Sequence, residues 1–243
     1  MRKTPKQRID TLLVTRGLVA SRTKAQAMLM AGEVLVGGKA VLKAGILVPE
    51  DADISLVKPP PFVGRGGLKL EYALEQFHLD VSGKTAADIG ASTGGFTDCL
   101  VQRGARRVYA IDVGTNQLDY RLRQDPRVVV MEGVNARYPL TLPEKVDLAT
   151  LDLSFISVTK VIPSASEILA ETGYLVILIK PQFEAKREEV GKGGIIKDPE
   201  VHARVLGRFI HWLTDNKFRL GGLVNSPVLG SSGNREFLFL LTR

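Results

Sequence analysis

The sequence predicts an α/β protein with a parallel sheet, preceded by a small α+β domain. After residue 67, strand-like and helix-like segments alternate, and such alternation requires a parallel sheet covered by helices on both faces. The first 58 residues instead contain two helical patterns followed by a hairpin. Three consecutive prolines at 59–61 then favour a stiff, extended connection. We therefore expect domains at 1–58 and 67–243, joined by a linker at 59–66.

Charge is distributed unevenly along the 243 residues. The net charge is +7, and the first 43 residues hold nine Lys or Arg against two acids. A basic block on a neutral body favours a polyanion-binding module, although a solvated basic surface has the same composition. The single cysteine, Cys99, excludes a disulfide framework and fits a reducing, cytoplasmic setting. Without a long apolar run or a signal peptide, we expect no membrane association.

The N-terminal domain is expected to contain two helices and three short strands. The first helix places its apolar residues on one face and ends in a glycine, and Ser21 is a good N-cap for the second. Gly37 and Gly38 form the dipeptide expected at a two-residue hairpin turn. In order, we expect helices at 5–17 and 22–32, a hairpin at 33–42 and a strand at 51–57.

The same stretch resembles a known RNA-binding domain. The pattern "RID..L...G...SR..A..M...G.V.V.G..V", read from Arg8 to Val41, is similar to the S4 domain of ribosomal protein S4. The resemblance implies that the second helix and the loop around it face RNA, with Arg8, Arg22 and Lys24 near phosphates. Such contacts give salt-dependent affinity but read little sequence. We also assign Arg65, in the glycine-rich loop after the prolines, to RNA binding.

In the C-terminal body, the elements follow one another as expected for a Rossmann-like methyltransferase. A helix with Lys69 in its first turn precedes the sheet, and the last two strands have no helix between them, which predicts an antiparallel hairpin at the end of the sheet. The strands are expected at 84–90, 106–112, 127–133, 145–154, 173–181, 218–228 and 235–242, and the helices at 63–77, 95–104, 116–124, 158–170 and 199–216.

The loop after the first of these strands, "DIGASTGG" at 88–95, is the candidate cofactor loop. Its glycines allow a sharp turn and close approach of a ligand to a helix N-terminus, although a structural turn has the same composition. Neither the fuller glycine pattern of an NAD site nor the Lys of a P-loop is present, so S-adenosyl-L-methionine suits the loop better. The expected cofactor-binding residues are Asp88, Gly90, Ser92, Thr93, Gly94, Asp112, at the ribose, and Asn135, near the adenine.

Polar residues at strand ends are the candidates for chemistry. Asp152 and Lys180 end two apolar strands, whose carboxyl ends share one crevice. A lysine after Val-Ile-Leu-Ile needs a partner if buried, and the alternative is a lysine that emerges at the surface. Glu236, at the start of the last strand, and Lys69 are expected at the same crevice. The three histidines lack metal-ligand spacing, and no metal is expected.

Five motifs, "GRGGLKL", "DIGASTGGF", "LDLSFIS", "LIKPQFE" and "GNREF", resemble the TlyA family. These ribosomal RNA 2′-O-methyltransferases, often labelled hemolysin A, are related to the FtsJ-like methyltransferases. The resemblance implies a catalytic tetrad of Lys69, Asp152, Lys180 and Glu236. It also implies that the partner is ribosomal RNA or a ribosomal subunit, and that the target nucleoside is cytidine. Ser92 replaces the second glycine of many other methyltransferases. Lys180 is expected to orient or deprotonate the ribose hydroxyl, but which lysine acts as base stays open.

Two other functional classes compete with this hypothesis. A non-catalytic RNA-binding protein with a degenerate methyltransferase fold is disfavoured by the intact tetrad and loop. A membrane-lytic toxin is disfavoured because no long apolar segment or aromatic amphipathic helix is present. The polar segment 184–198 is either a lid, an RNA-contacting loop or a merely solvated loop. Oligomeric state cannot be predicted from the sequence.

Overall fold

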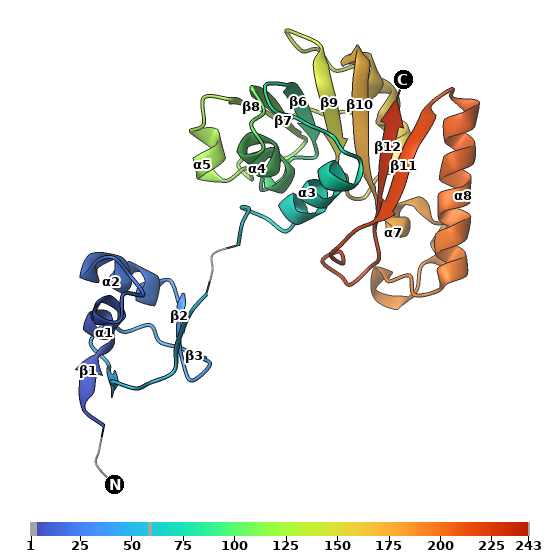
Figure 1. Ribbon diagram of the computed structural model, residues 1–243. Coiled ribbons are helices and arrows are strands. Elements are labelled where there is room, and N and C mark those ends of the chain that lie inside the picture. Colours follow the sequence, from blue (N-terminus) through green and yellow to red (C-terminus); the bar gives the residue numbers. More distant parts are fainter. Residues whose placement is uncertain (1–3, 58–59, 243) are drawn as a thin grey trace. The chain divides into compact units, whose positions relative to one another are not determined.

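The computed structural model describes residues 4–57 and 60–242 and divides the chain into two compact units, one ending at Pro60 and the other beginning at Pro61 (Figure 1). Residues 58 and 59, the latter in the predicted linker, lie outside the described part. Residues 61–66, also assigned to the linker above, belong to the second unit. Each unit has its own apolar core.

The N-terminal unit packs two helices against two small antiparallel sheets. Strand β1 pairs with β4, and β2 lies between β3 and β5. Ile9, Leu13 and Leu29 are fully buried at its centre. The elements are β1 (Lys6–Arg8), α1 (Ile9–Thr15), α2 (Arg22–Met30), β2 (Val34–Val36), β3 (Lys39–Ala40), β4 (Leu47–Pro49) and β5 (Ile54–Leu56).

The structure confirms the predicted helix cap and hairpin turn of this unit. The Ser21 hydroxyl caps α2 by accepting the Lys24 N–H at 3.3 Å. Gly37 and Gly38 have φ of 55° and 77°, as the hairpin turn requires. The helix predicted from residue 5 was wrong at its start, because residues 6–8 pair with β4, a strand that the sequence analysis missed. Short edge strands of three residues carry too little periodicity to be recognised.

The second unit is built on a seven-stranded sheet, in the order β11-β12-β10-β9-β6-β7-β8. Strands β10, β9, β6, β7 and β8 are parallel, whereas β12 is antiparallel to both of its neighbours, which confirms the predicted terminal hairpin. The strands are β6 (Thr85–Ile89), β7 (Arg107–Asp112), β8 (Val128–Glu132), β9 (Val146–Leu151), β10 (Leu169–Ile179), β11 (Arg219–Asn225) and β12 (Phe237–Thr242).

Helices cover both faces of this sheet (Figure 1), and alternate strand residues point into two cores. Helices α3, α4 and α5 enclose one core, and α6 and α8 enclose the other. Along β6, for example, Ala86 faces the first core and Ala87 the second. The helices are α3 (Gly66–Gln76), α4 (Gly95–Gln102), α5 (Tyr120–Arg123), α6 (Ile162–Glu167), α7 (Pro181–Glu184) and α8 (Pro199–Asp215), with short 3₁₀ turns η1 (Val158–Lys160), η2 (Arg187–Glu189) and η3 (Lys192–Gly194).

Two predicted helices were too long. The helix expected at 116–124 spans only Tyr120–Arg123, because the Asp119 side chain caps it by accepting the Arg121 N–H. The helix expected at 158–170 is divided into η1 and α6, and Leu169 already pairs with Val146 in the sheet. In both places a local polar cap or sheet pairing overrides the helical periodicity.

Candidate active site

The loop after β6 adopts a conformation that requires glycine. Gly90 has φ of 86°, and a Cβ there would lie 2.5 Å from the carbonyl oxygen of Asp152. The Asp112 carboxylate at the end of β7 holds the turn: it accepts the Ser92 N–H at 2.8 Å and the Gly114 N–H at 2.7 Å. The loop is thus tied to the neighbouring strand by the same acid that was expected at the cofactor ribose.

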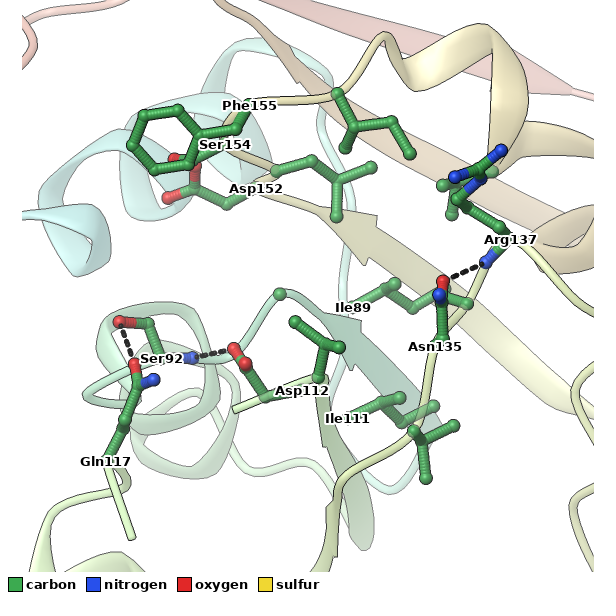
Figure 2. Close-up of a pocket in the computed structure, with 17 residues that line it drawn as sticks. Ile89, Ser92, Ile111, Asp112, Gln117, Asn135, Arg137, Asp152, Ser154 and Phe155 are labelled. Atoms are coloured by element: carbon green, nitrogen blue, oxygen red, sulfur yellow. Dashed lines mark hydrogen bonds between the residues drawn. The ribbon is translucent and has the colours of Figure 1, made fainter. Parts of the chain in front are cut away.

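A cavity of about 480 Å³ opens at the carboxyl ends of β6, β7 and β9 (Figure 2). Asp112 and Ser92 line one side, and Asp152 and Phe155 the other. Of the predicted cofactor residues, the cavity is lined by Gly90, Ser92, Asp112 and Asn135. Thr93 lines a smaller adjoining cavity, and Gly94 and Asp88 line neither.

The chemistry of this cavity suits S-adenosylmethionine. Val113 and Val134 offer apolar surface for a planar ring beside the polar Asn135. The Asp112 carboxylate can also accept hydrogen bonds from ribose hydroxyls. Gly90 lets the backbone approach a ligand closely. These features fit the cofactor-binding role predicted for Gly90, Asp112 and Asn135, which stays a prediction.

Asp88 is fully buried beneath the loop. Its two carboxylate oxygens accept the hydroxyl protons of Thr97, at 2.7 Å, and Thr150, at 2.9 Å. Burial raises the pKa of this carboxyl to about 6, and the negative charge of Asp152 adds to the rise, whereas the hydrogen bonds from the two threonines oppose it. Asp88 thus joins β6, α4 and β9 beneath the cavity, and its role in cofactor binding stays a prediction.

The four predicted catalytic residues form two ion pairs. Lys180 Nζ lies 2.7 Å from Asp152 Oδ1 and donates to Ser154 Oγ at 3.0 Å. Lys69 Nζ lies 2.5 Å from Glu236 Oε2, and both side chains are less than 10% exposed. The partner that a buried Lys180 needed is therefore present, and so is one for Lys69.

Glycines bring the start of α3 close to this site. A Cβ on Gly66 would lie 3.7 Å from Asp152 Oδ2, and one on Gly95, at the start of α4, would lie 3.0 Å from Gly67 N. A Cβ on Gly67 itself would fall 2.2 Å from the Phe62 ring. The "GRGG" run therefore serves close packing of α3 on α4, which carries the following lysine to the site.

Glu236 is positioned by the loop that precedes β12 and contains the motif "GNREF". A Cβ on Gly230 would lie 2.3 Å from Glu236 Oε1, so the turn packs directly on the carboxylate. The nearly buried Asn234 closes this turn through its carbonyl, which accepts the Gly230 N–H at 2.9 Å. Its side chain accepts the Ile196 N–H at 2.9 Å and donates to the Gly194 carbonyl at 2.8 Å. The segment 184–198 is thus tied to the loop that carries Glu236.

Two aromatic residues beside Lys180 were missed in the sequence analysis. Phe155 is 91% exposed and has φ of 64°, a strained conformation for a bulky residue. Its ring lies 5.1 Å from that of Phe183. The half-buried Glu184 anchors the same loop by accepting from Ser157 Oγ at 2.6 Å and Val158 N–H at 2.8 Å. In sequence, a phenylalanine near a strand end is indistinguishable from a core residue.

A smaller cavity of about 170 Å³ adjoins the first and includes the exposed Arg65 together with Asp152, Ser154 and Lys180. Asp152 and Ser154 line both cavities. The Lys180–Asp152 pair thus lies where the two cavities meet, which is the place for chemistry between a bound cofactor and a second molecule.

The candidate RNA-binding residues of the N-terminal unit lie around α1 and α2. Arg8 and Arg22 both pair with the fully buried Asp10, at 3.0 Å and 2.9 Å, and their side chains are 46% and 56% exposed. Lys24 is exposed on α2. The two arginines therefore have a structural partner inside the unit while their outer surfaces face solvent.

Comparison with known proteins agrees with both units. The family model described as FtsJ-like methyltransferase matches residues 62–243. The chain belongs to the FtsJ-like methyltransferase family. The S4 domain model matches residues 7–54, which confirms the domain type predicted there. The protein is a methyltransferase, and its cofactor is S-adenosyl-L-methionine, as expected.

Relatives of this FtsJ-like methyltransferase resemble it over nearly its whole length. YqxC of Bacillus subtilis is 47% identical, with 97% of this chain and 85% of that protein covered. The Mycobacterium tuberculosis protein named 16S/23S rRNA (cytidine-2′-O)-methyltransferase TlyA is 41% identical, with 97% and 90% covered. A solved hemolysin-named structure from Streptococcus thermophilus aligns with a TM-score of 0.74 at 43% identity, covering 98% of this chain and 88% of that one.

The described part of the FtsJ-like methyltransferase offers neither a membrane-spanning helix nor a cluster of metal ligands. Among residues 4–57 and 60–242, no helix is long and apolar enough to cross a membrane. Within that same described part, no three His, Cys, Asp or Glu residues gather in a group able to hold a metal ion.

Proposed function

We propose that this protein transfers a methyl group from S-adenosylmethionine to a ribose 2′-hydroxyl of ribosomal RNA, with cytidine as the target nucleoside. One observation carries the proposal: the Lys180–Asp152 pair lies where the cofactor-sized cavity meets a second cavity. The S4 domain and the printed name of the TlyA relative support RNA as the substrate. A ribosomal subunit is the proposed partner, and the cytoplasm the proposed location.

The residues at the junction can align a hydroxyl and remove its proton. S-adenosylmethionine, when bound, supplies a methyl group already activated by its sulfonium. Asp152 and Ser154 hold the Lys180 amine in a fixed direction, so that it can hydrogen-bond the ribose hydroxyl and assist its deprotonation. The buried Lys69–Glu236 pair completes the proposed tetrad. Lys180 lines the second cavity, whereas Lys69 and Glu236 line neither cavity, so this geometry favours Lys180 as the base.

The surface around the second cavity has features that suit a nucleotide. Phe155 lines the larger cavity, and its exposed ring, supported by Phe183, offers a flat surface on which an unstacked base can stack. Arg65 is exposed at the smaller cavity and can contact a phosphate. We therefore propose that the target nucleotide binds across the smaller cavity and the neighbouring Phe155 ring.

The decisive experiment measures methyl transfer from labelled S-adenosylmethionine to purified ribosomal subunits and to ribosomal RNA. Lys180→Ala is expected to reduce the rate by at least about 100-fold, as for loss of a general base, and to leave cofactor affinity nearly unchanged. Lys217→Ala is the matched control. Lys217 is exposed just before the start of β11, which pairs with the end of β12, whereas Glu236 precedes the start of β12. If the wild type binds cofactor and subunits yet transfers nothing, the proposal is wrong and a non-catalytic RNA-binding role remains.

A further inference from the structure

The N-terminal unit contains one fully buried carboxylate, that of Asp10, although burial of a charged group does not help an apolar core. Asp10 is 0% exposed and follows directly on the buried Ile9 in α1. It accepts from Arg8 Nε at 3.1 Å and Nη2 at 3.0 Å, and from Arg22 Nε at 2.9 Å. Gln26 Nε2, at 3.1 Å, and the Thr11 N–H, at 2.9 Å, complete its shell. One buried acid thus gathers two cations from different elements.

The charge of Asp10 is of the wrong sign for a surface that binds a polyanion. The unit is basic, and each acid in it weakens long-range attraction to phosphates. Asp10 can compensate for this loss by orienting the two arginine side chains. Arginine side chains have many rotamers, and fixing them before binding removes an entropic cost at the moment of association.

The pairing leaves donors of both arginines free. Arg8 uses Nε and Nη2 on Asp10, so Nη1 makes no bond to the acid; Arg22 uses Nε, and both of its Nη groups remain. The two side chains are about half exposed. Two guanidinium groups are therefore held on one carboxylate with donors directed elsewhere, an arrangement suited to bidentate contact with phosphate oxygens.

We propose that Asp10 is a positioning residue for RNA binding, which orients Arg8 and Arg22 toward the phosphates of one RNA strand. The inference rests on the proposed function, because it presumes that the N-terminal unit binds RNA. It goes beyond that function in assigning a role in RNA recognition to an acid that never touches the RNA.

Charge and orientation predict opposite results for Asp10→Asn. The variant gains one unit of net positive charge, so charge alone predicts tighter binding to purified ribosomal RNA at 0.15 M salt. Positioning predicts affinity weakened about tenfold, because the neutral amide no longer holds two guanidinium groups. Asp53→Asn is the matched control: Asp53 is exposed in the same unit, and its replacement changes the charge equally. Tighter or unchanged binding by Asp10→Asn overturns the inference.

A second variant tests the inference if Asp10→Asn disturbs folding. Arg22→Lys keeps the charge on a half-exposed side chain but cannot reproduce the Nε bond to Asp10. Positioning predicts weaker RNA binding with unchanged cofactor affinity, whereas charge alone predicts no change in either. Unchanged RNA binding by this variant also overturns the inference.

The double variant Arg8→Ala/Arg22→Ala separates failure of this inference from failure of the proposed function. If Asp10 acts only by orienting the two arginines toward RNA, the double variant binds RNA more weakly, and adding Asp10→Asn weakens it no further. If the double variant binds RNA as tightly as the wild type, RNA binding by this surface is itself wrong. If it binds more weakly but Asp10→Asn and Arg22→Lys do not, the positioning role alone fails.

Discussion

Asp10 and Asp88 are both fully buried, one in each unit, and they have opposite surroundings. Asp10 is held by two guanidinium groups, which keep the pKa of its carboxyl well below the usual range. Asp88 is held by two threonine hydroxyls, and burial raises the pKa of its carboxyl to about 6. Burial alone therefore does not determine how an acid behaves; the charge of its partners does.

The different partners of Asp10 and Asp88 correspond to the different parts of the molecule in which the two acids lie. Asp10 lies under a solvent-facing pair of arginines, where a permanent negative charge keeps the cations in place. Asp88 lies beneath the cofactor loop, where neutral hydroxyls connect β6 to α4 and β9 without introducing a cation. The first acid organises a binding surface, and the second stabilises the frame of a cavity.

The largest expected consequence is a pH dependence of the second unit. Below about pH 4, Asp88 is protonated in both the folded and unfolded states. Between pH 4 and 6 the unfolded chain releases this proton while the folded one retains it, so stability falls as pH rises. With a folded pKa of about 6 and an ordinary value of 3.8, the free energy of unfolding should fall by about 3 kcal/mol.

Amide hydrogen exchange in the full chain measures this effect, because it reports β6 and α4 separately from the N-terminal unit. The comparison is between the wild type and Asp88→Asn, which keeps the shape and removes the titration. The wild type should lose stability from pH 4 to 6 relative to the variant. Parallel curves for the two proteins would contradict the raised pKa of Asp88.

The N-terminal unit should respond to pH in the opposite sense. Because the pKa of Asp10 is lowered in the folded state, its stabilising effect is fully present above about pH 4 and is lost as pH falls below that value. Loss of charged hydrogen bonds to the arginines should cost about 2 kcal/mol. Exchange of α1 amides between pH 4 and 2.5, compared with Asp10→Asn, measures this. Equal losses in both proteins would mean that the arginines do not stabilise the ionised acid.

The sequence predicted much of the site because its residues lie at strand ends. Asp112, Asp152 and Lys180 end or follow apolar strands, and the carboxyl ends of parallel strands necessarily meet at one edge. The antiparallel course of β12 brings Glu236 to the same edge. Periodicity and topology are sufficient for these assignments.

Roles that depend on side-chain packing could not be predicted in the same way. Nothing in the motif "RID" indicates that its acid would be buried between two arginines. Phe155 looks like a core residue in sequence, yet it is exposed with positive φ. The "GRGG" glycines belong to a glycine-rich loop in sequence, whereas Gly66 and Gly67 begin α3 and lie against Gly95 of α4. Such features depend on which surfaces meet in three dimensions.

A smaller effect is expected from the hydroxyls around Asp88. Thr97→Val removes one donor to the carboxylate at nearly constant volume, and at pH 7 this should cost about 1.5 kcal/mol. At pH 4, where Asp88 is protonated, the loss should be smaller, and the pKa of Asp88 should rise above 6. Thr214→Val is the control, since its exposed hydroxyl donates to the Ile210 carbonyl at 3.1 Å, within the same helix. Carboxyl ¹³C titration by NMR measures the pKa, and an unchanged value would mean that Thr97 does not stabilise the anion.

The smallest expected effect is a difference in how salt changes the contributions of Asp10 and Asp88 to stability. Raising NaCl from 0.05 M to 1 M shortens the screening length from roughly 14 Å to about 3 Å. The Arg8 and Arg22 side chains are about half exposed, so screening should weaken their attraction to Asp10 by less than about 0.5 kcal/mol. Asp88 is fully buried and accepts hydrogen bonds from two neutral hydroxyls, so its contribution should change less than that of Asp10. Each contribution is the difference in stability between wild type and the corresponding Asp→Asn variant, so effects of salt on the rest of the chain cancel. A salt dependence for Asp88→Asn as large as that for Asp10→Asn would contradict the contrast between a charge-paired and a hydroxyl-bound acid.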